Sequence, residues 1–451
     1  MLLKFLFRDR VFNRKLFALT LPISLQNLML ALVAAADALM LGKLNQDAMA
    51  AVSLATQIQF IQNMFLAAVC SGAGVLGAQY WGKKDVPYLG RLFGLIVRES
   101  LLISIIFFIG CRFFPEYLMR LFASDPILIN NGVEYLKIAS WSYLVTGISQ
   151  CYLAIMRVSE HAVYSAWISS IIVVLNIVLN AVFIFGLCGA PAMGVKGAAL
   201  ATLIARIVEL CWCAGTTFGK SFIKLKIKTI FIFERILIID FWRYTAPILG
   251  AFMLWGVGFT AYTAIMGHMG RDAAAANAIA AVVRDLMCCL CNGVAVGSGI
   301  IIGNELGAGN LAKGKRCGQR AMMMSFIIGI VSMLVILSSI PVVLYFIHLT
   351  ELAQKYMTGM FMIMSFYMIG RCVCTVTING VFAAGGDTMF DPISLAVCMY
   401  GIALPCAFLG AFYFHFPVLL IYGCTCLDEV GKIPWVMYHF YKYRWVRNIT
   451  R

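Results

Sequence analysis

The chain has 451 residues, of which 62% are hydrophobic and only 12% are charged. Soluble domains carry about 25% charged residues, so this composition excludes a soluble enzyme, a disordered chain and a disulfide scaffold. The net charge is +15. Nucleic-acid binders gather their cations on a solvated face, whereas here long apolar runs separate the cations. The composition predicts a polytopic membrane protein with no nucleic-acid partner.

The N-terminal segment, residues 1–15, alternates apolar and basic side chains. It lacks the uninterrupted apolar core and the cleavage site of a signal peptide. We expect an amphipathic, basic segment that lies on the cytoplasmic surface of the membrane.

Twelve apolar stretches follow, each long enough to cross a bilayer as a helix of about 20 residues. They lie near residues 16–42, 49–80, 89–111, 134–156, 163–187, 195–218, 243–267, 276–306, 318–347, 354–384, 392–414 and 417–441. Because the number is even, both chain ends are expected on the same side. With that side cytoplasmic, 23 Lys and Arg fall in inner segments and seven in outer ones. The excess of inner cations predicts cytoplasmic termini in a cell membrane.

The two halves of the sequence resemble each other. A shift of 225 residues places Pro22 on Pro247 and Gly42 on Gly267, and it also aligns DALMLGKLNQDAMAAVSLA with YTAIMGHMGRDAAAANAIA. Six helices in each half predict parallel repeats, an arrangement suited to alternating access. The expected domains are an N-terminal lobe (16–218), a basic cytoplasmic linker (219–242), a C-terminal lobe (243–441) and a basic cytoplasmic tail (442–451).

Most acidic residues within the spans have a cation close by in sequence, which favours ion pairs over ligand roles. These groups are Arg98 with Glu99, Arg206 with Glu209, Arg284 with Asp285, and a cluster of Asp428, Glu429 and Lys432 in the last span, with Glu429 and Lys432 at i,i+3. Asp37 differs, because no cation lies between Lys15 and Lys43 in its span. An intramembrane carboxylate without a partner is a functional candidate by default. We expect Asp37 to bind and release a proton or a sodium ion, with a protonated helix-packing role as the alternative.

Polar side chains in two further spans could complete this site. Asn176 and Asn180 are spaced i,i+4 on one face of the fifth span, and Thr202 lies in the sixth. Their counterparts in the second half are apolar or weakly polar, so a cation site in the N-terminal lobe is the simplest interpretation. Amide hydrogen bonds between helices, and back-bonding of the threonine, stay open as alternatives.

The C-terminal lobe offers candidates for a substrate cavity. Trp255, Tyr262 and Met253 could line a surface that packs around varied apolar ligands, and Gln150 of the N-terminal lobe is a further candidate. Arg371 could pair with an acid, bind an anionic group or extend toward the membrane surface.

Catalytic or metal-binding patterns are not visible in the sequence. Cys288 and Cys291 form a CxxC without a second pair or a histidine at metal-ligand spacing, so we expect buried free thiols. The histidines are scattered near span ends. We therefore expect no enzyme, no cofactor and no metal, apart from a coupling ion, H⁺ or Na⁺, at Asp37.

These motifs resemble the multidrug and toxic compound extrusion (MATE) transporters of the multidrug/oligosaccharidyl-lipid/polysaccharide flippase superfamily. The similarity rests on AADALMLGKLNQDAMAAVSLA in the first span, GAQYWGKKD with its mate GNELGAGN, NIVLN, KGAALAT and GGDT. It implies an all-α, V-shaped exporter of two six-helix lobes around a central cleft, with Asp37, Asn176, Asn180 and Thr202 at cation-site positions. NorM-like members carry acids in the seventh and tenth spans. This chain has none there and carries Arg371 instead, so it is more similar to the DinF-like branch.

The expected function is a secondary antiporter that exports small amphipathic, often cationic, organic compounds in exchange for H⁺ or Na⁺, working as a monomer in the lipid bilayer. The alternative within the same superfamily is a flippase for lipids or lipid-linked oligosaccharides. A flippase must hold phosphate groups and would need several unpaired cations. An ion channel or a membrane enzyme is the alternative from another class.

Overall fold

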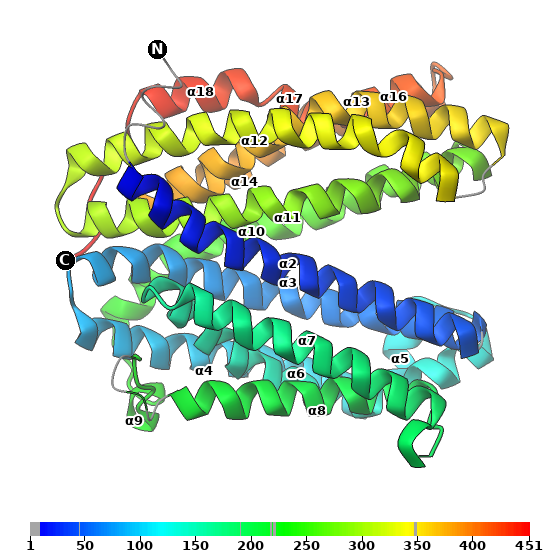
Figure 1. Cartoon of the computed structure of the whole chain (residues 1–451), viewed down its shortest axis with the longest axis horizontal. Coiled ribbons are helices and arrows are strands. Elements are labelled where there is room, and N and C mark those ends of the chain that lie inside the picture. Colours follow the sequence, from blue (N-terminus) through cyan, green and yellow to red (C-terminus); the bar gives the residue numbers. More distant parts are fainter. Residues whose placement is uncertain (1–9, 45, 190, 217–218, 220–221, 347–349) are drawn as a thin grey trace. The chain divides into compact units, whose positions relative to one another are not determined.

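A computed structural model describes residues 10–44, 46–189, 191–216, 219, 222–346 and 350–451. Inside its helices, the side chains at 10–11, 31–32, 34–35, 37–39, 42–44, 46, 188 and 346 lie outside the described part. The described residues form helices joined by short loops and include no strand (Figure 1). Contacts divide the chain into two compact units, and the boundaries between them fall within helices α2 and α10.

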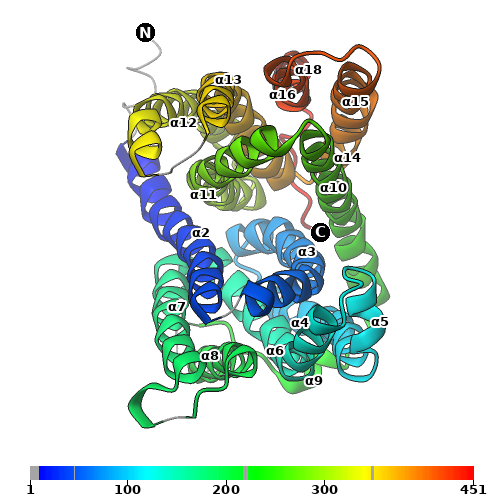
Figure 2. The same ribbon diagram turned by 90° about the vertical axis from the view of Figure 1, so that its right-hand side faces the viewer.

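The first unit comprises Leu25–Trp242. It contains the second part of α2 (Arg10–Leu44), α3 (Gln46–Gly82), α4 (Val86–Phe113), α5 (Pro115–Arg120), α6 (Pro126–Val158), α7 (Ala162–Phe185), η1 (Leu187–Gly189), α8 (Val195–Gly215) and α9 (Ile227–Ile230). Its long helices pack nearly parallel or antiparallel to one another and are seen almost end-on in Figure 2. The side chains of Asp85 and Asp125 cap α4 and α6, and a proline follows each cap within the first turn.

The second unit comprises Arg243–Arg451 together with the start of α2, up to Ser24. Its helices are α10 (Arg235–His268) from Arg243 onward, α11 (Arg271–Gly307), α12 (Leu311–Phe346), α13 (Glu351–Thr375), η3 (Val376–Phe382), α14 (Phe390–Leu395), η4 (Ala396–Ala403), α15 (Leu404–Phe412), α16 (Val418–Thr425), α17 (Leu427–Val430) and α18 (Ile433–Tyr441). The η3 and η4 segments are π-helical continuations of their neighbours.

Nine helices of the described part of the chain have the length and apolar composition to cross a membrane. The other three predicted spans correspond to α2, to α6 and to the stretch from α16 to α18. The V shape expected from the resemblance depends on how one unit is placed against the other, and it stays a prediction.

The start of α2 packs against helices of the second half of the chain, although the sequence repeat predicts that it belongs to the first lobe. Phe12 and Leu16 are buried in a cluster with Val294 and Ile302 of α11. Ser24 Oγ donates to the carbonyl of Leu290 at 3.5 Å. Gly293 and Gly297 on α11 lie close to α2 at Thr20 and Ser24, where a larger side chain would collide with the facing helix.

The twelfth predicted span, 417–441, is not one continuous helix. Turns at Cys426 and at Gly431–Lys432 divide it into α16, α17 and α18. Pro434 lies in the first turn of α18, where its missing N–H breaks no helical hydrogen bond. The charged residues of α17, Asp428 and Glu429, therefore lie between these two turns, inside the second unit.

The basic tail at 442–451 packs against the second unit. Trp445 is fully buried and its ring stacks on Phe440 with 5.6 Å between the centroids. Arg447 donates to the carbonyls of Gly385 and Gly386, each at 2.7 Å. The tail therefore forms part of the folded unit.

Candidate functional site

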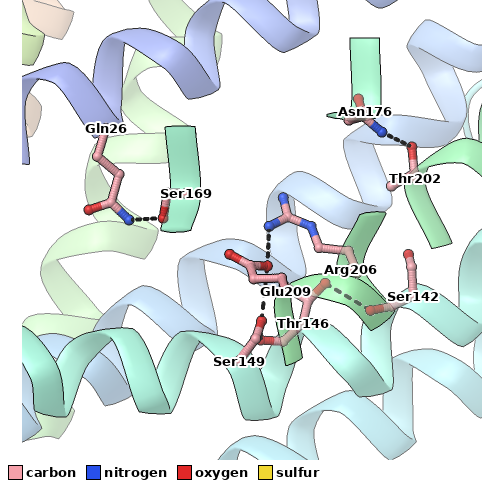
Figure 3. A network of polar contacts seen from close by, with 9 residues as sticks. All are labelled: Gln26, Ser142, Thr146, Ser149, Ser169, Asn176, Thr202, Arg206 and Glu209. Atoms are coloured by element: carbon pink, nitrogen blue, oxygen red, sulfur yellow. Dashed lines mark hydrogen bonds and ion pairs between the residues drawn. The ribbon is translucent and has the colours of Figure 1, made fainter. Parts of the chain in front are cut away.

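The predicted amides of the first unit lie together where α7 meets α8. Asn180 Nδ2 donates to Asn176 Oδ1 at 3.3 Å, one turn away on α7. Asn176 Nδ2 in turn donates to Thr202 Oγ1 on α8 at 3.5 Å (Figure 3). Both asparagines are buried. The structure thus brings three of the four predicted cation-site residues into one chain of contacts.

Thr202 also makes the back-bond that was its alternative interpretation. Its hydroxyl donates to the carbonyl of Ala198 at 3.1 Å. Because that hydroxyl proton is used within the helix, the oxygen faces Asn176 as an acceptor. The back-bond and the interhelical contact therefore occur together.

Asp37, the fourth predicted residue, belongs to α2, but its side chain lies outside the described residues.

A contact that sequence reasoning missed joins α2 to α7. Gln26 is buried, and its Nε2 donates to Ser169 Oγ at 2.8 Å (Figure 3). A glutamine within an apolar span was a signal that could have marked this position, but the partner lies 143 residues away. The bond fixes the register of α2 against the helix that carries both asparagines.

The charge of Glu209, a buried acidic residue of the first unit, is balanced by a neighbouring arginine. Arg206 Nη1 donates to its Oε2 at 2.8 Å, as the i,i+3 spacing predicts. Ser149 on α6 donates to the same oxygen at 3.2 Å (Figure 3). This arrangement ties α6 to α8 and leaves no free carboxylate charge there.

The second unit contains a partly open cavity of about 240 Å³ between α10, α11, α13, α16 and α17. Three predicted cavity residues line it, namely Trp255, Tyr262 and Arg371. Met253 lies on α10 outside the lining, and Gln150 lies on α6 in the other unit. The cavity therefore gathers the predicted aromatic and basic residues of this lobe but neither Met253 nor Gln150.

Arg371 pairs with an acid, which was one of the three roles open to it. Its Nη1 donates to Oε1 of Glu429 on α17. Lys432 Nζ lies 3.4 Å from the other oxygen of Glu429, as the i,i+3 spacing predicts. Arg371 also lies over the ring of Trp255, 5.9 Å from its centroid, where a cation–π contact is favourable.

Asp428 is an acidic residue of this cavity whose role the sequence did not reveal. We expected it to share in a neutralised cluster with Glu429 and Lys432. Its side chain is buried and lines the cavity, and its Oδ1 has no hydrogen-bond partner among the described residues. Helix α17 thus supplies buried acidic residues to the C-terminal lobe, although the seventh and tenth spans contain no acidic residue.

Comparison with known proteins places this architecture in a family. The MatE family model matches residues 22–182 and again residues 247–409. The two matches begin 225 residues apart, which confirms the internal repeat. The chain is 22% identical to the uncharacterized transporter YisQ of Bacillus subtilis (strain 168), over 93% of this chain and 92% of that protein. It is 24% identical to the probable multidrug resistance protein NorM of Mesorhizobium japonicum, over 89% and 88%.

Solved structures show the same fold. The Vibrio cholerae MATE transporter VcmN in its bent form has a TM-score of 0.86 at 17% identity, over 96% of this chain and 97% of that chain. A MOP superfamily transporter from Pyrococcus furiosus also has a TM-score of 0.86 at 17% identity, over 98% of each chain. These matches confirm the expected all-α, twelve-helix membrane fold. Since the family model covers most of both halves, the chain belongs to the MATE family of multi-pass membrane transporters, which are not enzymes.

Proposed function

We propose that this transporter is a secondary antiporter that exports small amphipathic organic compounds, with inward movement of H⁺ or Na⁺ coupled through Asp37. The observation that carries the proposal is the chain of contacts in the first unit from the buried Asn180 and Asn176 to the half-buried Thr202. Amide and hydroxyl oxygens beside a carboxylate are the ligands that a small hard cation prefers, and they also stabilise a carboxyl proton. Relatives named as multidrug resistance proteins support the export of drug-like compounds.

Helix geometry supports a role for Asp37 beside these amides. Gln26 and Asp37 are eleven residues apart on α2, and Ser169 and Asn180 are eleven apart on α7. Eleven residues make about three full turns and about 16 Å of rise, so each pair shares a helix face. The two helices run in the same direction (Figure 1). The bond between Gln26 and Ser169 therefore supports a position of Asp37 on α2 level with Asn180 on α7.

The flippase alternative is disfavoured by the state of the intramembrane arginines. A lipid-linked phosphate is a net anion, so it needs cations in excess of the acids around them. The four candidate arginines all pair with an acid. The pairs are Arg98 with Glu99, Arg206 with Glu209, Arg284 with Asp285, and Arg371 with Glu429.

The decisive experiment is ion-driven efflux in proteoliposomes with Asp37→Asn. We expect coupled transport of a fluorescent organic cation to fall at least about tenfold, because the amide cannot exchange a proton or balance the charge of Na⁺. Asp47→Asn, the same chemical change at an exposed position on α3, serves as the matched control. Coupled transport at the wild-type rate in Asp37→Asn would refute the assignment.

The same preparation identifies the coupling ion. Substrate-induced outflow of preloaded Na⁺, or alkalinisation of a proton-loaded interior, separates the two ions. The DinF-like assignment and cytoplasmic termini in the cell membrane belong to this proposal. Cysteine labelling of the two termini in intact cells tests the orientation.

A further inference from the structure

The cavity of the second unit has no ligand in the export proposal, yet its walls resemble those of a binding site. Small-molecule pockets combine apolar and aromatic walls with a few polar groups that fix orientation. The aromatic walls here are Trp255, Phe259, Tyr262, Tyr367 and Tyr422. The charged side chains are Arg284, Asp285, Arg371 and Asp428.

Both signs of charge are present in equal number in this lining. Arg284 donates from Nε and Nη2 to Oδ1 of Asp285, at 3.1 and 2.9 Å. Arg371 donates a hydrogen bond from Nη1 to Oε1 of Glu429. A guanidinium has five N–H donors, so each arginine retains donors that have no partner among the described residues. Because the two arginines and two aspartates cancel, a ligand without net charge is the best electrostatic complement.

Unsatisfied acceptors complete the site. Oδ1 of Asp428 and Oη of Tyr262 are both buried without a hydrogen-bond partner among the described residues, and both residues line the cavity. Asp428 is only 4% exposed. A buried carboxylate oxygen without a donor destabilises the protein unless a ligand supplies the donor.

We propose that this cavity binds a small zwitterion with an aromatic or apolar side chain. Its ammonium group donates to Asp428, and its carboxylate accepts from the free N–H groups of Arg371 and Arg284. Its ring packs among the aromatic walls. A simple cation would leave the guanidinium donors unused and lie near two positive charges, and a simple anion would leave Asp428 unpaired. That the zwitterion is exported rests on the proposed function, whereas its binding does not.

Equilibrium binding to the full chain in lipid nanodiscs, without any ion gradient, tests the proposal with three indole probes. Tryptophan carries both charges, tryptamine only the ammonium and indole-3-propionate only the carboxylate. By calorimetry we expect tryptophan to bind at least about tenfold more tightly than either analogue, since each analogue loses one charge-assisted contact. Tryptamine or indole-3-propionate binding as tightly as tryptophan overturns the proposal, as does no binding of any probe at about millimolar concentration.

A near-isosteric variant locates the site. Asp428→Asn is expected to weaken tryptophan binding about tenfold and to leave indole-3-propionate binding unchanged. Glu351→Gln, at an exposed position in the first turn of α13 of the same unit, is the matched control and should bind tryptophan as the wild type does. Wild-type binding of tryptophan by Asp428→Asn contradicts the assignment. Because no gradient is used, this test and the Asp37→Asn transport test can fail independently.

Discussion

Asn176 on α7 donates its side-chain N–H to the hydroxyl oxygen of Thr202 on α8, and it accepts at the same time from Asn180. The two helices that flank the proposed coupling site are thus joined by neutral polar groups rather than by an ion pair. Such groups can exchange partners when an ion or a proton arrives, without leaving a charge buried and unpaired.

The contact between Asn176 and Thr202 predicts a defined effect of two threonine variants. Thr202→Val keeps the side-chain shape but removes the hydroxyl oxygen that accepts from Asn176. We expect the rate of ion-driven efflux to fall about two- to tenfold, which corresponds to the free energy of one neutral hydrogen bond. Thr202→Ser keeps the hydroxyl and should retain the wild-type rate. Efflux assays on equal amounts of reconstituted protein measure both. A Thr202→Val variant as fast as Thr202→Ser would show that the hydroxyl has no part in coupling.

The bond between Gln26 and Ser169 predicts an energetic coupling between the two residues. In a double-mutant cycle of Gln26→Met and Ser169→Ala, we expect a coupling free energy of about 0.5–1.5 kcal/mol in unfolding, because the bond is buried and neutral. Denaturant titration of the purified protein measures it.

A control cycle combines Gln26→Met with Ser142→Ala, whose hydroxyl bonds within its own helix to Ala139. That cycle should be additive within about 0.5 kcal/mol. Equal coupling in both cycles would mean that Gln26 and Ser169 do not interact specifically.

Local relationships in this protein could be predicted from the sequence. The twelve helical stretches follow from runs of apolar residues. Three ion pairs, those of Arg98, Arg206 and Arg284, follow from acids one or three positions away. In each case a helix of known geometry brings together residues that are already neighbours in the chain.

Long-range relationships could not be predicted in the same way. Arg371 and Glu429 are 58 residues apart, and Gln26 and Ser169 are 143 apart. Which helix faces of an apolar bundle meet depends on packing that one sequence does not reveal. The break in the last span had a visible signal, Gly431 close to Pro434. The high hydropathy of residues 417–441 nevertheless predicted one continuous helix. The position of Asp428 in the cavity was therefore not predicted.

The Arg206 and Glu209 pair predicts a loss of stability that a second substitution restores. Glu209 is buried and Arg206 is mostly so. Arg206→Met leaves the carboxylate with only the Ser149 hydroxyl, and we expect a loss of about 3 kcal/mol, the lower end for a broken buried pair. Arg206→Met with Glu209→Met should recover most of it.

Lys196→Met is the control for this loss of charge. Lys196 pairs with Glu134 at 3.1 Å, but both side chains are about half exposed, so its removal should cost less than about 1 kcal/mol. Thermal unfolding in detergent ranks the variants. A double variant less stable than Arg206→Met alone would contradict the argument from an unpaired buried charge.

The packed C-terminal tail predicts that a residue near the end of the chain stabilises the second unit. Trp445 is fully buried, stacks on Phe440 and donates from Nε1 to the carbonyl of Phe440 at 3.2 Å. Trp445→Ala should therefore lower the free energy of unfolding by about 3–5 kcal/mol, as for other buried large-to-small changes. Tyr438→Ala removes an aromatic ring that is 63% exposed and should cost less than about 1 kcal/mol. Denaturant titration compares the two, and similar losses would mean that the tail is not part of the folded unit.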